Sequence, residues 1–155
     1  MIANWHSTHI DPGHLSRRLK IAYAMWLWQS VNCEDSLPTL DQIQSRRLYE
    51  EISPYLAIVE GRTGSAADGH FFASAGAKVE ALYDVSLNAK CMEEIHTEAG
   101  SRLAEESFAL LRKERRPVHL GIRGSPVLSS EIQMIVLPLR HINGDMELAG
   151  LVYDF

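Results

Sequence analysis

Residues 134–155 contain two apolar runs on either side of Asn143 and Gly144. Asn-Gly between apolar runs predicts a β-hairpin with a type I′ turn, which requires positive φ at both central residues. This turn sets the register of the two strands, and a pair of opposite charges supports it. The expected opposite pairs are Arg140 with Glu147, Leu139 with Leu148, Leu137 with Gly150, Val136 with Leu151, Ile135 with Val152 and Met134 with Tyr153.

Both faces of this hairpin are apolar. One face carries Ile135, Leu137, Leu139, Leu148 and Val152, and the other carries Met134, Val136, Pro138, Ala149, Leu151, Tyr153 and Phe155. An antiparallel sheet with one face in water alternates apolar and polar residues, so a further layer is expected to cover the second face. Pro138 cannot donate a ladder hydrogen bond, so a bulge or irregular bond is expected at that position.

A helical pattern over residues 14–33 supplies a candidate for that cover. One stripe of the helix carries Leu15, Leu19, Ala22, Trp26 and Ser30. The second half of the segment is apolar on nearly every side, which is typical of a buried helix. The part around Trp26 is therefore expected to cover the hairpin face that carries Met134, unless a second copy of the chain covers it.

The rest of the chain predicts separate regions of helix and strand. The expected helices cover residues 40–52 and 97–115, with shorter helical fragments from 77 to 95, and the expected strands cover residues 55–60, 69–75 and 118–124. Residues 1–13 end in the turn Asp11-Pro12-Gly13 and are expected to form a loose lead-in. Strands segregated from helices favour the α+β class, an antiparallel sheet with helices packed on it.

Length and charge limit the classes of protein. At 155 residues the chain is about one domain with ordinary globular composition. The net charge of −5 disfavours generic binding to nucleic acid or to an anionic membrane, since both require a basic surface. The longest apolar run near the start, residues 21–28, is too short to span a bilayer. Cys33 and Cys91 are expected to be reduced thiols, and a cytoplasmic location is expected.

Motifs for catalysis and metal binding are weak. The chain has no nucleophile elbow, phosphate loop or zinc-protease motif, so neither catalytic residues nor a metal site are expected. The spacing of His6, His9 and His14 could chelate a transition metal, but no cysteine or carboxylate cluster accompanies them. A lone His96 specifies a haem ligand poorly. The sequence identifies no cofactor.

From Trp28 onward, short motifs follow one another in an order that resembles a PAS domain. They are Trp28 on a helix, Leu37-Pro38, Ile52-Ser53-Pro54, LAIVE at 56–60, ASAGAKVEALYDVSL at 73–87, RRPVHLGIRG at 115–124, VLPL at 136–139 and LAGLVYDF at 148–155. They are similar to a bacterial, often single-domain, subgroup of that family. The resemblance covers about residues 25–155. The chain departs from the subgroup at residues 83–86, where relatives tend to have glycines.

The resemblance implies a five-stranded antiparallel sheet with helices on one face and an N-terminal helical extension. Residues 1–36 would be a lead-in with a capping or dimerisation helix, and residues 37–155 the PAS-like domain. The face with Leu137 and Val152 would line an interior that can hold a small apolar ligand. The expected pocket residues are Phe72, Tyr83, Met92, Leu103, Ile122, Leu137 and Val152. The expected dimer or partner residues are Leu19, Ala22, Tyr23, Trp26, Met134, Val136, Leu151 and Tyr153.

The expected function is a non-enzymatic sensory or regulatory module. It would be a homodimer that binds a small ligand or an unidentified signalling protein and acts through protein contact. Two alternatives stay open. One is an interaction scaffold without ligand, which works through its apolar sheet face. The other is a small cone-shaped isomerase or hydrolase with a buried titratable pair, for which Asp68, His70 and Glu80 are one possible group.

Overall fold

The computed structural model describes residues 2–5, 15–31, 33, 37–62, 69–91, 98–123 and 132–155. Its strands are β1 (Ile2–Trp5), β2 (Leu56–Arg62), β3 (His70–Ala75), β4 (Val118–Arg123), β5 (Ile132–Leu139) and β6 (Met146–Asp154). Its helices are α1 (Arg17–Ser30), α2 (Leu40–Gln44), α3 (Tyr49–Ile52), α4 (Ala77–Tyr83) and α6 (Glu98–Glu114), with a 3-10 turn at Ser53–Tyr55. The expected α+β class is confirmed.

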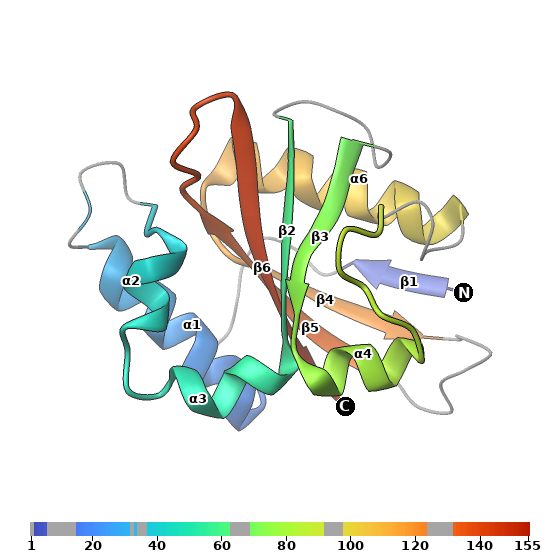
Figure 1. Ribbon diagram of the computed structural model, residues 1–155, viewed down its shortest axis with the longest axis horizontal. Coiled ribbons are helices and arrows are strands. Elements are labelled where there is room, and N and C mark those ends of the chain that lie inside the picture. The colour runs from blue at the N-terminus through green and yellow to red at the C-terminus, as the bar shows by residue number, and fades with distance from the viewer. Residues whose placement is uncertain are drawn as a thin grey trace.

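The strands form one antiparallel sheet in the order β1-β4-β5-β6-β2-β3 (Figure 1). Five of them are the expected strands, and the additional edge strand, β1, comes from the segment expected to be a loose lead-in. That expectation is wrong for Ile2–Trp5, which pairs with β4 from Trp5–Leu120 to Ile2–Arg123. A strand of four residues is too short to show a clear two-residue alternation, and the open edge of β4 supplies its hydrogen-bond partners.

The predicted register of the β5–β6 hairpin is confirmed from Leu139–Leu148 onward, whereas the expected pair of Arg140 with Glu147 is not part of the ladder. The observed pairs include Leu139 with Leu148, Leu137 with Gly150, Val136 with Leu151, Ile135 with Val152 and Met134 with Tyr153. The predicted turn type is wrong, since neither Asn143 nor Gly144 has positive φ. Instead, Asp145 N donates to the Asn143 side-chain oxygen and Met146 N donates to the Asn143 carbonyl, each at 3.0 Å. An asparagine side chain can close a turn in this way without a left-handed backbone.

Pro138 lies in regular strand, so the expected bulge is wrong. It pairs with Ala149 in unbroken register. Its carbonyl points away from β6 and accepts a hydrogen bond from Trp26 Nε1 at 2.7 Å. The nitrogen of Pro138 faces the same side as its carbonyl. The paired part of β4 does not reach this position, because it begins where Val118 pairs with Val136. The proline therefore removes no rung from the β5–β6 ladder.

The sheet separates two hydrophobic layers. The first layer, under α4 and α6, contains Ala57, Val59, Phe72, Val79, Leu87, Phe108, Leu111, Val118, Leu120, Ile132, Met134, Val136, Ala149, Leu151 and Tyr153. The second layer, under α1, α2 and α3, contains Leu15, Leu19, Ala22, Met25, Trp26, Ile43, Ile52, Leu56, Ile58, Ile135, Leu137, Leu139 and Val152. Figure 1 shows α1, α2 and α3 grouped together, apart from α4. Helices therefore cover both faces of the sheet.

The expected assignment of covers to faces is reversed. Helix α1 covers the face with Leu137 and Val152, whereas α4 and α6 cover the face with Met134 and Tyr153. The sequence could not decide between these arrangements, because both faces of the hairpin are equally apolar. The hydrogen bond from Trp26 to β5 adds a directional contact that no hydrophobic pattern contains.

The helix ends follow local capping chemistry. The expected helix over residues 40–52 consists of α2 and α3 with a turn between them, and α2 begins with a capping box formed by Thr39 and Gln42. The expected helix over residues 97–115 is α6. It ends where Arg115 adopts a φ of 54° and donates its N–H to the Leu111 carbonyl. Among the described helices, none is both long and apolar enough to cross a membrane.

Candidate functional site

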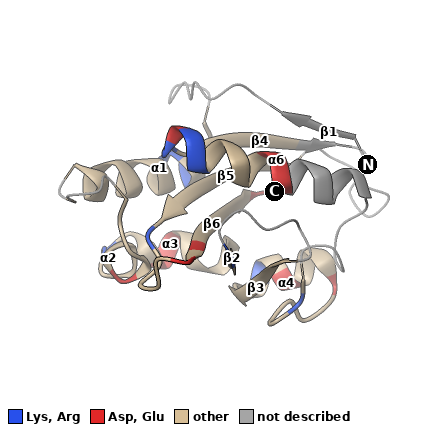
Figure 2. Cartoon of the chain, turned by 90° about the horizontal axis from the view of Figure 1, so that it is seen from above, with Lys and Arg blue, Asp and Glu red and all other residues tan. Residues whose placement is uncertain are grey.

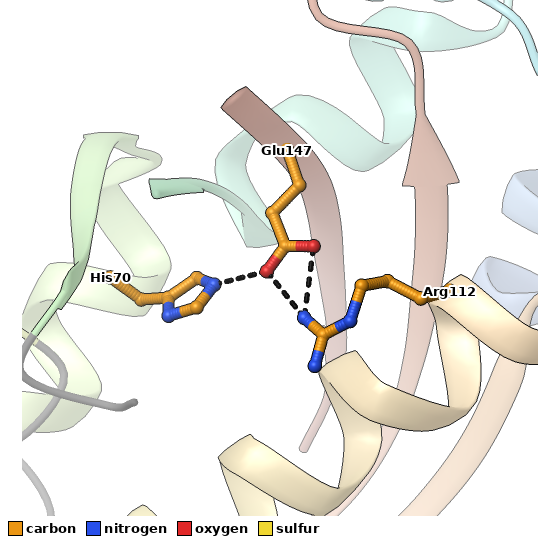
Figure 3. Close-up of polar contacts among 3 residues, drawn as sticks. All are labelled: His70, Arg112 and Glu147. Atoms are coloured by element: carbon orange, nitrogen blue, oxygen red, sulfur yellow. Dashed lines mark hydrogen bonds and ion pairs between the residues drawn. The ribbon is translucent and has the colours of Figure 1, made fainter. Parts of the chain in front are cut away.

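Three charged or titratable side chains from separate elements meet at one end of the sheet, and we call them the carboxylate cluster. His70 begins β3, Glu147 lies in β6, and Arg112 lies in the last turn of α6. Arg112 Nη1 donates to both oxygens of the Glu147 carboxylate, at 2.7 and 3.0 Å, and His70 Nε2 contacts Oε1 of the same group. Figure 3 shows His70 and Arg112 reaching Glu147 from opposite sides.

The register of the sheet explains how His70 reaches Glu147 across a strand. Gly61 of β2 pairs with His70 on one side and with Glu147 on the other. The side chains of such a row point to the same face, and two strand spacings, roughly 10 Å, separate the outer backbones. The ring of His70 crosses over Gly61, where an added Cβ would lie 2.5 Å from His70 Cδ2. The glycine therefore provides the space in which the contact forms.

The carboxylate cluster is largely removed from water. The side chains of His70, Glu147 and Arg112 are 2%, 13% and 33% exposed. The His70 ring also stacks on Phe108 of α6, with ring centroids 4.3 Å apart. A buried carboxylate is costly unless donors compensate it, and here an arginine and a histidine do so. The cluster thus ties α6 to the sheet and places a group that can exchange a proton beside a carboxylate.

A cleft of about 610 Å³ opens beside the carboxylate cluster. Its walls come from the segment before α2, the C-terminal half of α6 and the β5–β6 hairpin. The lining residues are Leu37, Phe108, Leu111, Arg112, Arg115, Pro138, Leu139, Arg140, His141, Gly144, Met146, Glu147 and Leu148. Arg112 and Glu147 therefore belong to both the cluster and the cleft. The volume lies within the range of small-molecule sites.

Both ring nitrogens of His141, at the edge of the cleft, make polar contacts. Its Nδ1 accepts a hydrogen bond from Asn143 N at 2.9 Å, and its Nε2 lies 3.1 Å from Glu60 Oε2. Because Nδ1 is the acceptor, the ring proton is assigned to Nε2, which donates to Glu60. The Glu60 carboxylate is thereby engaged with the histidine.

The expected pocket residues do not line one space. Phe72 and Tyr83 lie on the side of the first layer, whereas Leu137 and Val152 lie in the second layer, across the sheet. They were assigned to one interior because α1 was expected to cover the other face of the sheet, and the observed arrangement of the helices is the reverse. Three expected residues are not tested: Met92 and the side chains of Leu103 and Ile122 lie outside the described residues.

Tyr153, which is fully buried in the first layer, forms a pair with Tyr83, which is partly buried against that layer. Their hydroxyl oxygens are 3.1 Å apart, and their rings meet edge to face. Burial raises the pKa of both phenols above the ordinary value of 10.0, most strongly for Tyr153, whose pKa the neighbouring Tyr83 raises further. The two phenols are therefore neutral near neutral pH and do not act as bases there.

The expected partner residues are mostly covered within the chain itself. Leu19, Ala22 and Trp26 lie in the second layer with Tyr23 partly buried against it, and Met134, Val136, Leu151 and Tyr153 lie in the first layer. The exposed large apolar residues of α1 and its C-cap are Leu27 at 45%, Trp28 at 61% and Val31 at 73%. We call these three residues the outer face of α1, since they lie on the side opposite its buried stripe.

The sequence interpretation missed the carboxylate cluster. Glu147 was expected to pair with Arg140, and His70 was grouped with Asp68 and Glu80. Asp68 lies outside the described residues, and the Glu80 carboxylate accepts a backbone hydrogen bond at 2.8 Å. The sequence signal that could have indicated the cluster was Glu147 itself, because a carboxylate followed by a run of apolar strand residues requires a partner when it is buried.

The metal and haem candidates from the sequence, His6, His9, His14 and His96, lie outside the described residues. Within the part of the chain that the structure describes, no group of three or more histidine, cysteine, aspartate or glutamate side chains is arranged to hold a metal ion.

Comparison with known proteins yields neither a matching family model nor a matching curated protein.

Proposed function

We propose that the protein is a PAS-type regulatory module that binds a small ligand in the cleft and signals through protein contact. The order of elements from β2 onward supports this class: two strands, a short helix, a longer helix and three strands. The cleft also touches both hydrophobic layers, since Phe108 and Leu111 belong to the first and Leu139 to the second. A ligand there can thus alter the packing on either side of the sheet.

One observation carries the proposal, the buried hydrogen bond from Trp26 Nε1 to the Pro138 carbonyl at 2.7 Å. Pro138 lines the cleft, and Trp26 lies on α1, the helix whose outer face is apolar. A ligand that displaces Pro138 would displace α1 through this short connection. Ligand occupancy would thereby change the contacts that the outer face of α1 can make.

We propose a second copy of the chain as the partner of the outer face of α1. Contiguous exposed apolar side chains mark interaction surfaces, and Leu27, Trp28 and Val31 are contiguous on this helix. A two-fold axis lets the same helix face meet its own copy. A downstream signalling protein could then recognise the dimer in its ligand-bound or ligand-free arrangement.

Light scattering during size-exclusion chromatography tests the contact surface. The unaltered chain is expected to be a dimer, and Trp28→Glu is expected to be monomeric, because a carboxylate buried in an apolar contact is strongly unfavourable. Val85→Glu is the matched control, since Val85 is 44% exposed and follows α4 rather than α1. A monomeric parent chain, or a Trp28→Glu variant that stays dimeric, would contradict the proposed surface.

Native and denatured mass spectrometry of the purified chain distinguishes the ligand-binding regulatory module from the interaction scaffold without ligand. Extra small-molecule mass that disappears on unfolding supports the regulatory module. A dimer that carries no such mass favours the interaction scaffold.

The His70–Glu147 contact favours one alternative, an acid–base enzyme. A buried histidine beside a carboxylate, next to a cleft, is an arrangement that general acid–base catalysis uses. A ligand that is recovered chemically unchanged after long incubation with the chain supports the regulatory module. A ligand that is converted by the parent chain, and bound without conversion by His70→Gln, would instead support an enzyme.

A further inference from the structure

The turn of the β5–β6 hairpin contains the Asn-Gly pair of the sequence, Asn143 and Gly144. Both residues are exposed, and Gly144 lines the cleft. The Gly144 nitrogen is tethered to Asn143 Cγ through the Asn143 backbone, so a bond between these two atoms closes a succinimide ring. A tether of this kind replaces a collision between molecules by an intramolecular reaction, which is much faster.

The Gly144 nitrogen is open to react. Within the described part of the chain, no group accepts a hydrogen bond from the Gly144 N–H. Glycine has no Cβ that could obstruct the nitrogen. The surroundings do not obstruct it either, since even an added Cβ at this position would have no neighbour within 4 Å.

The side-chain carbonyl of Asn143 is polarised by the turn itself. Asp145 N donates a hydrogen bond to Asn143 Oδ1 at 3.0 Å. Because a backbone N–H only donates, the atom that faces it is assigned as the oxygen of the amide. Attack on Cγ places negative charge on this oxygen, and a donor already directed at it stabilises that charge. The hydrogen bond that closes the turn therefore also favours the attack.

We propose that Asn143 is a site of spontaneous deamidation, with water as the other reactant. A bond forms between Gly144 N and Asn143 Cγ, and the bond between Cγ and Nδ2 breaks. The amide nitrogen leaves as ammonia with the proton of the Gly144 N–H, and the succinimide remains. Water then opens this ring at either carbonyl, which gives aspartate or isoaspartate at position 143. Nothing is oxidised or reduced.

The isoaspartate product changes one wall of the cleft. It carries the backbone through the former side chain and so inserts a methylene group into a turn that Met146 N and the Asn143 carbonyl close at 3.0 Å. Either product adds a negative charge to the hairpin. Another wall of the same cleft carries the basic residues at the C-terminal end of α6, which Figure 2 shows in blue. Both the shape and the charge of the cleft are thus altered, whatever ligand it binds.

Peptide mapping by mass spectrometry, after incubation of the folded full chain in mildly alkaline buffer, tests the site. Asn88 is the internal control, because it is also exposed, but the Ala89 N–H that would attack it donates to the Phe72 carbonyl at 2.8 Å. Asn143 is expected to convert at least about tenfold faster than Asn88, a ratio that requires only a modest difference in activation free energy. Similar rates at the two asparagines would overturn the proposal.

Gly144→Ala is the matched variant, since its Cβ meets no neighbour and the φ of Gly144 is not positive. It is expected to slow conversion of Asn143 by about tenfold, because a methyl group then obstructs the attacking nitrogen. Conversion of Asn88 should stay the same, which shows that the fold is intact. An unchanged rate at Asn143 in this variant would overturn the assigned nucleophile.

Hydrogen exchange of the Met146 amide tests the effect on the cleft wall. In the purified isoaspartate form this amide is expected to exchange about tenfold faster, because the lengthened turn no longer holds it against the Asn143 carbonyl. Freshly purified Asn143→Asp is the control, since it adds the charge without the methylene group, and it should keep the parent protection. Parent-like protection in the isoaspartate form would contradict the inferred change in the wall.

Discussion

At the scale of single residues, Gly61 shows how an absent side chain can create a contact between two others. It lies between His70 and Glu147 in one row of the sheet. The contact between these two residues depends on the histidine ring occupying the space above the glycine. A side chain at position 61 would compete with that ring and would also meet the Gly69 carbonyl, 2.6 Å from an added Cβ.

Gly61→Ala is therefore expected to lower the free energy of unfolding by roughly 1–3 kcal/mol, the usual range for overpacking. Urea unfolding followed by circular dichroism measures this change. Gly144→Ala is the matched control, because an added Cβ there has no neighbour within 4 Å and its φ is not positive. Its free energy of unfolding should stay within about 0.5 kcal/mol of the parent value. A Gly61→Ala variant as stable as the parent would contradict the proposed role of the glycine.

The pair of Tyr83 and Tyr153 predicts a loss of stability in alkaline solution. Burial raises the pKa of Tyr153 and of Tyr83 above 10.0, the value near which both titrate in the unfolded chain. Above that pH the unfolded state loses its phenol protons first, so the free energy of unfolding falls as pH rises. Below it both states keep these protons, and the pair adds no pH dependence.

Tyr153→Phe should reduce this alkaline loss, because it removes the phenol with the larger shift. Urea unfolding of parent and variant between roughly pH 8 and pH 11 measures the difference in slope. Identical slopes in the two proteins would show that the tyrosine pair does not control the alkaline transition.

At the scale of elements, β1 covers an edge of the sheet that would otherwise be open. It pairs with β4 and also packs beneath α6. Unpaired strand edges offer N–H and carbonyl groups to other chains, and proteins commonly cover them. The segment thus gives β4 a partner on its outer side, although it contributes few residues.

Deletion of residues 1–5 is expected to expose the outer edge of β4. Hydrogen exchange of the β4 amides should become at least about tenfold faster, since local opening would no longer have to break the β1 ladder. The amides of β3, at the opposite edge of the sheet, serve as the internal control. Unchanged protection throughout β4 would show that β1 does not secure this edge.

At the scale of the whole molecule, the structural features that could be predicted from the sequence are those that depend on residues close together in the chain. The hairpin register was predictable because one local turn sets every pair from Leu139–Leu148 to Met134–Tyr153. The helix over residues 97–115 and the strands from 55 to 75 were predictable from periodicity and flanking breakers. The turn type was wrong, yet the register held, because the turn at Asn143 connects the two strands at the same place in the chain.

Features that depend on distant pairing were not predictable. The cover of each sheet face was reversed, since equally apolar faces carry no signal for one helix over another. The carboxylate cluster requires the pairing of β2 with both β3 and β6, together with the docking of α6. Neither His70 nor Arg112 has a local pattern that indicates Glu147 as its partner. The strand β1 pairs with a strand from the other end of the chain, which a pattern of four residues cannot reveal.

Strand β6 lies between β5 and β2 in the middle of the sheet, although it follows every other strand in the chain. During synthesis on the ribosome, β2 and β3 therefore emerge long before the strand that pairs with the other side of β2. Neither hydrophobic layer is complete before β6 is present, because β6 supplies Tyr153 to the first layer and Val152 to the second. Until residues 146–154 have left the exit tunnel, the nascent chain lacks the strand that pairs with both β5 and β2. Chaperones that bind exposed strands can act during this interval.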